Sequence, residues 1–242
     1  MAWKRFSFVS DAHGDQIDKT AEKAFFRFVA DFKPQIRIFG GDLWDMRPLR
    51  RGADEEEKRE ALKLDFDAGM EFAYKYKPTN MLLGNHDHRL YNLAENGYGI
   101  TQEYAKSLVS EATILFDKLK CPVLPYDKRK GVLSIGKMNC IHGFTSGPTA
   151  ARKSALVYGN VLMGHTHGIS SCTIEGLDDR TGRICGCLVT LDMPYNSMHM
   201  GALQHRHGWG MGVINDKTGI FHFSQVEGVG GRFISPTGFK EV

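Results

Sequence analysis

Residues 82–87 have the sequence Leu-Leu-Gly-Asn-His-Asp, which joins two features that decide the fold. The apolar run before Gly84 is typical of a buried strand, and the amide, imidazole and carboxylate after it predict a polar turn at the carboxyl end of that strand. Taken alone, the stretch also fits an ordinary helix start, in which Asn85 takes the turn and Asp87 caps the helix. A functional interpretation is favoured because other predicted strands of this chain end in the same way.

The first half of the chain alternates predicted strands with predicted helices. Strands are expected at 6–10, 35–39 and 80–83, and helices at 16–32, from Asp54 to Pro78, and at 88–119 with a break near 96–99. A helix that connects two strands in this order implies a right-handed crossover and a parallel pair. In an open α/β sheet the carboxyl ends of such strands form one crevice, where their polar residues would converge.

The second half is richer in strands. We expect strands at 132–135, 138–141, 183–191, 210–214 and 219–223, and one helix at 149–158. There is no internal repeat and no linker-like segment. The sequence therefore predicts a single domain over residues 1–242, with a helical insertion around 47–78 and a strand-rich carboxyl-terminal half.

Composition excludes some classes of protein. Of the 242 residues 42% are hydrophobic and 24% are charged, which is ordinary for a globular chain, and the net charge of +3 is too small to indicate a nucleic-acid or membrane partner by itself. The five cysteines are odd in number and include no C-x-x-C pair, which favours reduced thiols. No apolar run is long enough for a signal sequence or a membrane span. We expect a cytoplasmic protein.

Metal-ligand side chains follow five of the predicted strands. They are Asp11 and His13, Asp42, Asn85 with His86, His142, and His165 with His167. Carboxylate, imidazole and amide donors without thiolates suit manganese, iron or zinc in five- or six-coordination. This number of donors is too large for one ion and fits two ions that share a carboxylate. Such ions, roughly 3.5–4 Å apart, clamp the attacking and leaving oxygens of a phosphoryl transfer.

The same residues resemble a known family. Asp11-x-His13, Gly41-Asp42-x-x-Asp45, Gly84-Asn85-His86-Asp87, His142-Gly143 and Gly164-His165-Thr166-His167 look like the five signature motifs of the calcineurin-like metallophosphoesterases, in their usual order over residues 6–168. The resemblance implies an α/β fold, a four-layer α/β/β/α sandwich of two facing mixed β-sheets flanked by helices. It also implies hydrolysis of a phosphoester by in-line attack of a hydroxide that bridges two divalent ions, with manganese as the first expectation and iron or zinc as alternatives.

The resemblance also implies a role for each site residue. The first metal would be held by Asp11, His13 and His167, the second by Asn85, His142 and His165, and Asp42 would bridge the two. His86 would not bind metal but would stabilise the transferring phosphoryl group or protonate the leaving oxygen, with Asp87 orienting its ring. Asp45 would steady one of the metal-binding histidines.

Departures from known subfamilies bear on the substrate. Protein Ser/Thr phosphatases carry arginine directly after the second aspartate of the second motif, where this chain has Met46, with Arg47 one position further on. The UDP-diacylglucosamine hydrolases typically carry arginine where His86 stands, and the repair exonucleases have a longer capping domain. We expect a phosphodiester substrate, with nucleic acid or a nucleotide favoured. The alternatives are a phosphomonoesterase of small metabolites or phosphoproteins, and a catalytically silent metal-bearing interaction module.

Two further clusters are candidate substrate contacts. Arg47, Arg50 and Arg51 could bind a non-scissile phosphate, because guanidinium groups match phosphate oxygens bidentately, or could form a solvated basic turn that the acidic residues 54–57 balance. His205 and His207, in a cluster with His199, Arg206 and Trp209 that follows Pro194-Tyr195-Asn196, could stack bases or hold phosphate, or could simply be strand and loop residues.

Overall fold

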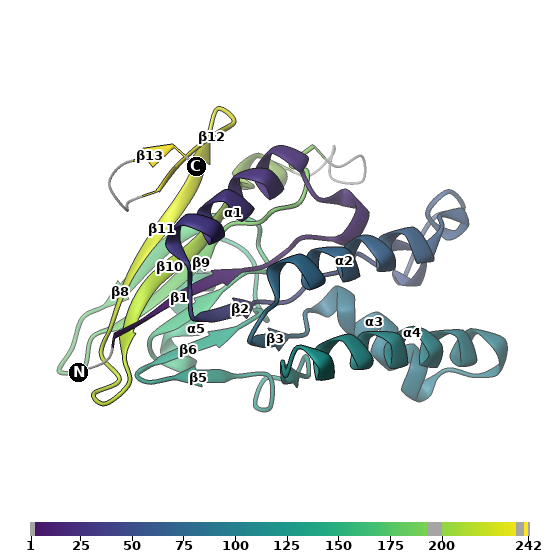
Figure 1. Ribbon diagram of the computed structural model, residues 1–242, viewed down its shortest axis with the longest axis horizontal. Coiled ribbons are helices and arrows are strands. Elements are labelled where there is room, and N and C mark those ends of the chain that lie inside the picture. The colour runs from purple at the N-terminus through teal and green to yellow at the C-terminus, as the bar shows by residue number, and fades with distance from the viewer. Residues whose placement is uncertain (1–2, 193–199, 236–239, 242) are drawn as a thin grey trace.

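The computed structural model describes residues 3–192, 200–235 and 240–241, which form two mixed β-sheets with helices on their outer faces (Figure 1). The larger sheet has the strand order β13-β12-β11-β10-β1-β2-β3-β4. Its strands are β1 (Trp3–Val9), β2 (Ile36–Phe39), β3 (Asn80–Leu82), β4 (Val123–Leu124), β10 (Gly208–Asn215), β11 (Phe221–Val229), β12 (Arg232–Ser235) and β13 (Lys240–Glu241). The smaller sheet has the order β5-β6-β7-β9-β8. It contains β5 (Leu133–Ile135), β6 (Met138–Ile141), β7 (Val161–Met163), β8 (Ile169–Ile174) and β9 (Arg180–Cys185).

Helices connect the parallel strands. They are α1 (Lys19–Phe32), α2 (Leu62–Tyr76), α3 (Asn85–Asn96), α4 (Gly99–Lys118) and α5 (Ala150–Tyr158). The pairs β1–β2, β2–β3 and β3–β4 are parallel, as are β6–β7 and β7–β9. Within each sheet the loops that leave these strands therefore open on one edge.

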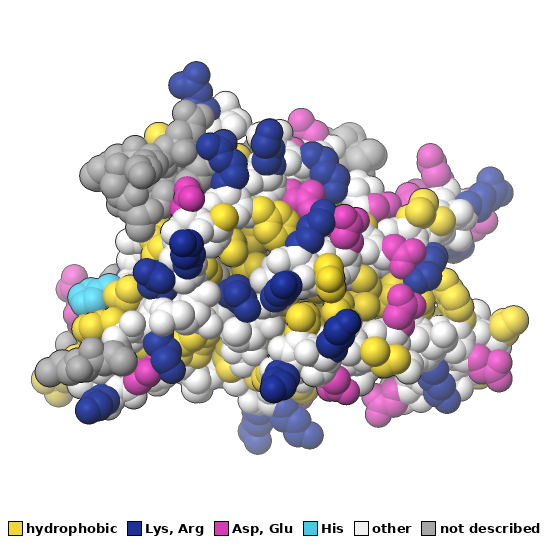
Figure 2. Space-filling model, in the orientation of Figure 1, with side chains coloured by type: hydrophobic (Ala, Val, Ile, Leu, Met, Phe, Trp, Pro, Cys, Tyr) yellow, Lys and Arg dark blue, Asp and Glu magenta, His cyan; other side chains and the backbone are white. Residues whose placement is uncertain are grey.

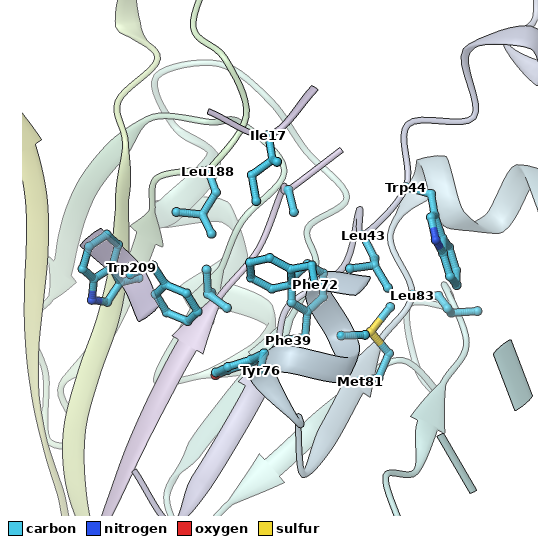
Figure 3. Close-up of a cluster of buried hydrophobic side chains, with 14 of the residues drawn as sticks. Ile17, Phe39, Leu43, Trp44, Phe72, Tyr76, Met81, Leu83, Leu188 and Trp209 are labelled. Atoms are coloured by element: carbon cyan, nitrogen blue, oxygen red, sulfur yellow. The ribbon is translucent and has the colours of Figure 1, made fainter. Parts of the chain in front are cut away.

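Alternation along β1 shows how the layers form. Phe6 and Phe8 face the smaller sheet and belong to a buried cluster with Met138, Cys140 and Leu162. Val9 belongs to the other core, which lies between the larger sheet and helices α1, α2 and α4. Figure 3 shows part of this core, where Phe72 and Tyr76 of α2 lie close to Phe39 and Met81 of the sheet.

The fourth layer is α5. Its residues Ala150, Ala151 and Ala155 form a third buried cluster with Ile141 of β6 and Met163 of β7. The order is thus helices, larger sheet, smaller sheet, helix. The predicted α/β/β/α sandwich is confirmed.

Helix α2 and the α3–α4 hairpin extend well beyond the edge of the larger sheet (Figure 1). The helix expected to begin at Asp54 begins instead at Leu62, after a single 3-10 turn at Glu57–Arg59. The predicted capping pair is present, since Asp54 Oδ1 accepts from the Glu57 N–H (2.8 Å) and Glu57 Oε2 accepts from the Asp54 N–H (3.0 Å). The capping pair caps only the 3-10 turn and not α2, because the buried apolar residues that stabilise α2 begin after this turn.

The predicted strand at 183–191 also ends early, at Cys185. Gly186 turns the chain with a φ of +80°, and the next segment crosses toward the other sheet, where the Leu188 N–H donates to the Asp11 carbonyl (3.0 Å). This crossing brings the carboxyl-terminal half against the loop that follows β1.

Three compositional expectations can be compared with the structure. All five cysteines are free. None of the helices in the described part of the chain is both long and apolar enough to cross a membrane. On the face drawn in Figure 2, lysine and arginine side chains are dispersed, and the described residues of this face form no continuous basic patch.

Candidate dinuclear metal site

The loops after five strands bring the predicted metal-ligand side chains together. Asp11 and His13 follow β1, Asp42 follows β2, Asn85 begins α3 after β3, His142 follows β6, and His165 and His167 follow β7. Both sheets therefore contribute, because their carboxyl edges lie next to each other across the sandwich.

The donor atoms form two groups. In the first, His167 Nε2 lies 3.4 Å from Asp11 Oδ1 and 3.1 Å from His13 Nε2. In the second, Asn85 Oδ1 lies 3.0 Å from His142 Nε2 and 2.9 Å from His165 Nδ1. These are the two sets that the sequence resemblance implies.

Asp42 lies between the two groups. Its Oδ2 atom is 3.2 Å from His142 Nε2 in the second group and 3.9 Å from His13 Nε2 in the first. Burial alone would raise the pKa of Asp42, but the neighbouring His142 and His86 rings hold it well below its ordinary value. The Asp42 carboxylate therefore stands within 4 Å of ring nitrogens of histidines from both groups.

These separations fit metal binding. Ligand atoms at 2.0–2.2 Å from a common ion stand about 3–3.5 Å apart, close to the spacing within each group. The groups contain only oxygen and imidazole nitrogen, which suit manganese, iron or zinc in catalytic sites. Asp11, His13 and His167 would hold one ion, Asn85, His142 and His165 the other, and Asp42 both.

Hydrogen bonds fix the rings of two of these histidines. His142 Nδ1 donates to the Gly40 carbonyl (2.9 Å), and His13 Nδ1 lies 3.1 Å from Asp45 Oδ1. Because Nδ1 of each ring is held by a hydrogen bond, Nε2 of each ring points toward the other candidate metal ligands of its group. Asp45 thus contacts one of the histidines predicted to bind metal, the position that the resemblance implies for it.

The backbone of the site is strained. Five of its donor residues have positive φ angles: Asp11 (57°), His13 (52°), Asp42 (55°), His165 (70°) and His167 (56°). A non-glycine residue in this left-handed region costs about 1–3 kcal/mol and persists only where its surroundings hold it. In the loop after β1 these turns direct Asp11 and His13 to the first group, and in the loop after β7 they direct His165 to the second group and His167 to the first.

Two glycines of the motifs leave space for the carboxylates. A Cβ at Gly84 would stand 2.0 Å from Asp42 Oδ1, and one at Gly164 would stand 2.3 Å from Asp11 Oδ2. Any side chain at either position would displace a donor. The glycines that precede Asn85 and His165 are therefore required by packing against the site.

Asp87 differs from the prediction. Its carboxylate does not contact the His86 ring but accepts backbone N–H groups of Asp42 (2.8 Å), Trp44 (3.0 Å) and Gly84 (2.8 Å). The bond from Gly84 caps α3, which is the ordinary role considered for this residue. Asp87 acts on the loop that carries Asp42, and its predicted role in orienting His86 is wrong.

The carboxylate that orients His86 is Asp45. His86 Nδ1 lies 2.6 Å from Asp45 Oδ1, and His86 Nε2 is turned toward Asp42 Oδ2, 4.0 Å away. Burial favours the neutral ring, but Asp42 and Asp45 raise the pKa of His86. Asp65 of α2 holds the Asp45 loop, since it accepts from the backbone N–H groups of Asp45 (3.0 Å) and Met46 (2.7 Å).

Arg89 is a neighbour of the site that sequence reasoning missed. Its Nη1 donates to the Asp45 carbonyl (2.9 Å) and lies 3.1 Å from His86 Nδ1. The signal was present in the sequence, because residues three apart on a helix lie on the same face and Arg89 is three residues after His86.

The arginine cluster is not arranged for a phosphate contact at Arg47. This guanidinium is buried and bonds Asp15 (3.0 Å to both oxygens), Asp45 (3.1 Å) and Glu60. Three carboxylates already occupy its donors, so Arg47 fixes the Asp45 side chain rather than facing open space. Arg50 pairs with Glu57, and Arg51 is exposed.

The second cluster divides. The His205 ring lies 4.9 Å from the His167 ring, beside the first group of donors. The His207 Nε2 donates instead to the Val189 carbonyl (3.0 Å), and Trp209 is fully buried against Phe25. His199 and the Pro194-Tyr195-Asn196 stretch lie outside the described residues. Of the two histidines predicted to contact substrate, only His205 is next to the site.

No protein-family model matches the chain, and no curated protein matches its sequence. Solved structures do match. Vps29 from Chaetomium thermophilum is 10% identical over 99% of this chain and 92% of its own, with a TM-score of 0.48. YfcE, a phosphoesterase from E. coli, is 16% identical over 92% and 98%, with a TM-score of 0.37. A phosphatase from Mycoplasma pneumoniae is 10% identical over 94% of both chains, with a TM-score of 0.44.

At these identities, what the site can do has to be inferred from its own side chains. The seven donor residues and His86 all belong to the five sequence motifs. In the arrangement of its layers and in the order of these motifs, the chain resembles the calcineurin-like metallophosphoesterases.

Proposed function

We propose that this chain is a dinuclear metal-dependent phosphoesterase of the calcineurin-like kind. The observation that supports the proposal is the grouping of seven oxygen and nitrogen donors into two sets with Asp42 between them. If these residues were only structural, the protein would gain nothing from burying so many polar side chains together at one point. It would also gain nothing from holding five of them in a strained backbone conformation.

The chemistry follows from the two sets. When bound, two divalent cations, manganese with iron or zinc as alternatives, would polarise the phosphoryl oxygens and lower the pKa of a water molecule. Asp42 supplies negative charge to both sets. His86 Nδ1 donates to Asp45, so Nε2 carries a proton when the ring is the imidazolium, the form that Asp42 and Asp45 favour by raising the pKa of His86. That Nε2 proton can pass to the leaving oxygen, which leaves the neutral ring.

We further propose a phosphodiester substrate, with nucleic acid or a nucleotide favoured. Helix α2 and the α3–α4 hairpin extend past the sheet edge that carries the donors and would give the site a wall longer than one phosphate needs. A phosphomonoesterase and a silent metal-bearing module are the competing functions.

Metal analysis and a substrate panel test the proposal. We expect two bound divalent ions per chain and manganese-dependent hydrolysis of bis-p-nitrophenyl phosphate faster than of p-nitrophenyl phosphate, lost on chelation and restored by the metal. Single-stranded DNA, duplex DNA, RNA and cyclic nucleotides would then be compared. A preference for the monoester would favour the phosphomonoesterase, and metal binding without turnover on any ester would favour the silent module.

His205 offers a second prediction. Replacing His205 with alanine is expected to lower kcat/KM about tenfold or more, because the ring beside His167 would donate a hydrogen bond to a charged phosphoryl oxygen. His207→Ala is the matched control, since that ring is bonded to a backbone carbonyl away from the donors. Steady-state kinetics would compare the two, and equal effects would contradict a substrate contact at His205.

A further inference from the structure

A cavity of about 290 Å³ opens beside α3. It is lined by Leu49 and by Arg89, Asn92, Leu93, Asn96 and Gly97. We propose that this cavity binds the nucleobase of the leaving half of a phosphodiester substrate. The inference rests on the proposed function, because it takes His86 as the group that faces the leaving oxygen.

The position of the cavity links it to His86. Arg89, which lines it, has its Nη1 atom 3.1 Å from His86 Nδ1. Asn92, Leu93 and Asn96 continue the same stripe of the helix at spacings of three and four residues. At 1.5 Å per residue, Asn92 lies about 9 Å along the helix from His86. Arg89 therefore joins the cavity to the Nδ1 side of the His86 ring, whose Nε2 faces Asp42.

The lining suits a flat ring with polar edges. Leu49 and Leu93 are partly buried and give it apolar walls, while Asn92 and Asn96 are exposed at its rim. The Asn96 amide donates to Asn92 Oδ1 (3.0 Å), and within the described ranges neither the Asn92 amino group nor the Asn96 carbonyl oxygen has another partner. A donor close to an acceptor matches the edge of a nucleobase, which asparagine side chains commonly bond.

The size of the cavity restricts the ligand. Pockets for drug-sized molecules measure about 300–1,000 Å³, so this one suits a single ring system rather than a paired or stacked segment. A base in a duplex would first have to leave its stack. Substrates with an unpaired base after the scissile phosphate should therefore be preferred over duplex DNA.

Binding of nucleosides tests the cavity without turnover. The full chain would be titrated with adenosine, cytidine and, as a probe without a base, ribose, while the side-chain amide NMR signals of Asn92 and Asn96 are followed. We expect both nucleosides to shift these signals and ribose not to. The Asn92→Ala/Asn96→Ala double variant should lose nucleoside binding, and Glu95→Ala, an exposed change on the same helix, should keep it. Absence of shifts, or equal shifts with ribose, would overturn the proposal.

Kinetics test the cavity with the reaction. For the dinucleotides ApA and dApdA the double variant should raise KM about tenfold, since two hydrogen bonds are lost, with kcat unchanged. For the methyl ester of adenosine 3′-phosphate, whose leaving half has no base, KM should not change. If the enzyme hydrolyses both substrate types and the double variant changes KM equally for both, the base site is overturned and the proposed function is not. If nucleosides bind but no phosphoester is hydrolysed, the proposed function is overturned.

Discussion

Replacing His86 with alanine is expected to lower kcat by about 10²–10⁴-fold while two divalent ions stay bound. General acid catalysis by a positioned side chain contributes an effect of this size. The His86 ring lies outside the two groups of donors described above, in a separate cluster with His13 and Asp45. The loss should be larger for an ester with an alkoxide leaving group than for one that releases p-nitrophenolate, because the latter leaves readily without a proton. Steady-state kinetics on both ester types, with metal analysis of the same preparation, would measure this.

Two results would contradict that role. Loss of either metal in the His86 variant would indicate that the ring acts through the metal site, and an equal loss for both leaving groups would exclude proton donation. Added imidazole should restore part of the activity of His86→Ala if the missing group is a proton donor. The unfolding midpoint serves as the control for folding.

Replacing Asp42 with asparagine is expected to abolish paired metal binding and activity together. Loss of residues that merely orient metal ligands costs 10–100-fold in affinity, so loss of the carboxylate between both groups should cost at least roughly 100-fold. Asparagine keeps the oxygen that accepts the His86 backbone N–H (2.8 Å), so the fold should be retained. Calorimetric titration with manganese would measure the affinity.

Asp87→Asn is the matched comparison for Asp42→Asn. It also changes a buried carboxylate, but one on α3 that bonds the backbone of the Asp42 loop and of Gly84 rather than the donor groups. Its main effect should be on the unfolding midpoint. Normal manganese affinity in Asp42→Asn would show that this carboxylate does not join the two sites.

The convergence of the seven donors was predictable because it follows from chain topology. Parallel strands share a carboxyl edge, so polar residues placed directly after strands meet there whatever the details of packing. The layer order was predictable for a similar reason, since alternating residues such as Phe8 and Val9 must face different cores.

The pairing of His86 was not predictable. Asp87 is its neighbour in sequence, but successive residues of a helix point in different directions, and His86 and Asp87 are the second and third residues of α3. Asp45 reaches the ring because Met46 adopts a left-handed conformation and Asp65, from another helix, fixes the loop. Such contacts between segments distant in sequence leave no local pattern.

Arg47 failed as a phosphate contact for the same reason. Two of the carboxylates that engage it, Asp15 and Glu60, lie 32 and 13 residues away along the chain. The short cluster of arginines showed only that charge was present. Its partners were set by the tertiary fold.

The left-handed donor residues also have a consequence for evolution and engineering. At His13, His165 and His167 a glycine would relieve the backbone, so selection for thermal stability alone would favour replacing them. At Asp11 and Asp42 asparagine would be favoured, because it tolerates this conformation and keeps an oxygen that accepts a backbone N–H. A library of variants screened only for folding should accumulate glycine or asparagine at these positions. Their persistence as aspartate and histidine would then record selection for what the side chains do, independently of any assay of substrate.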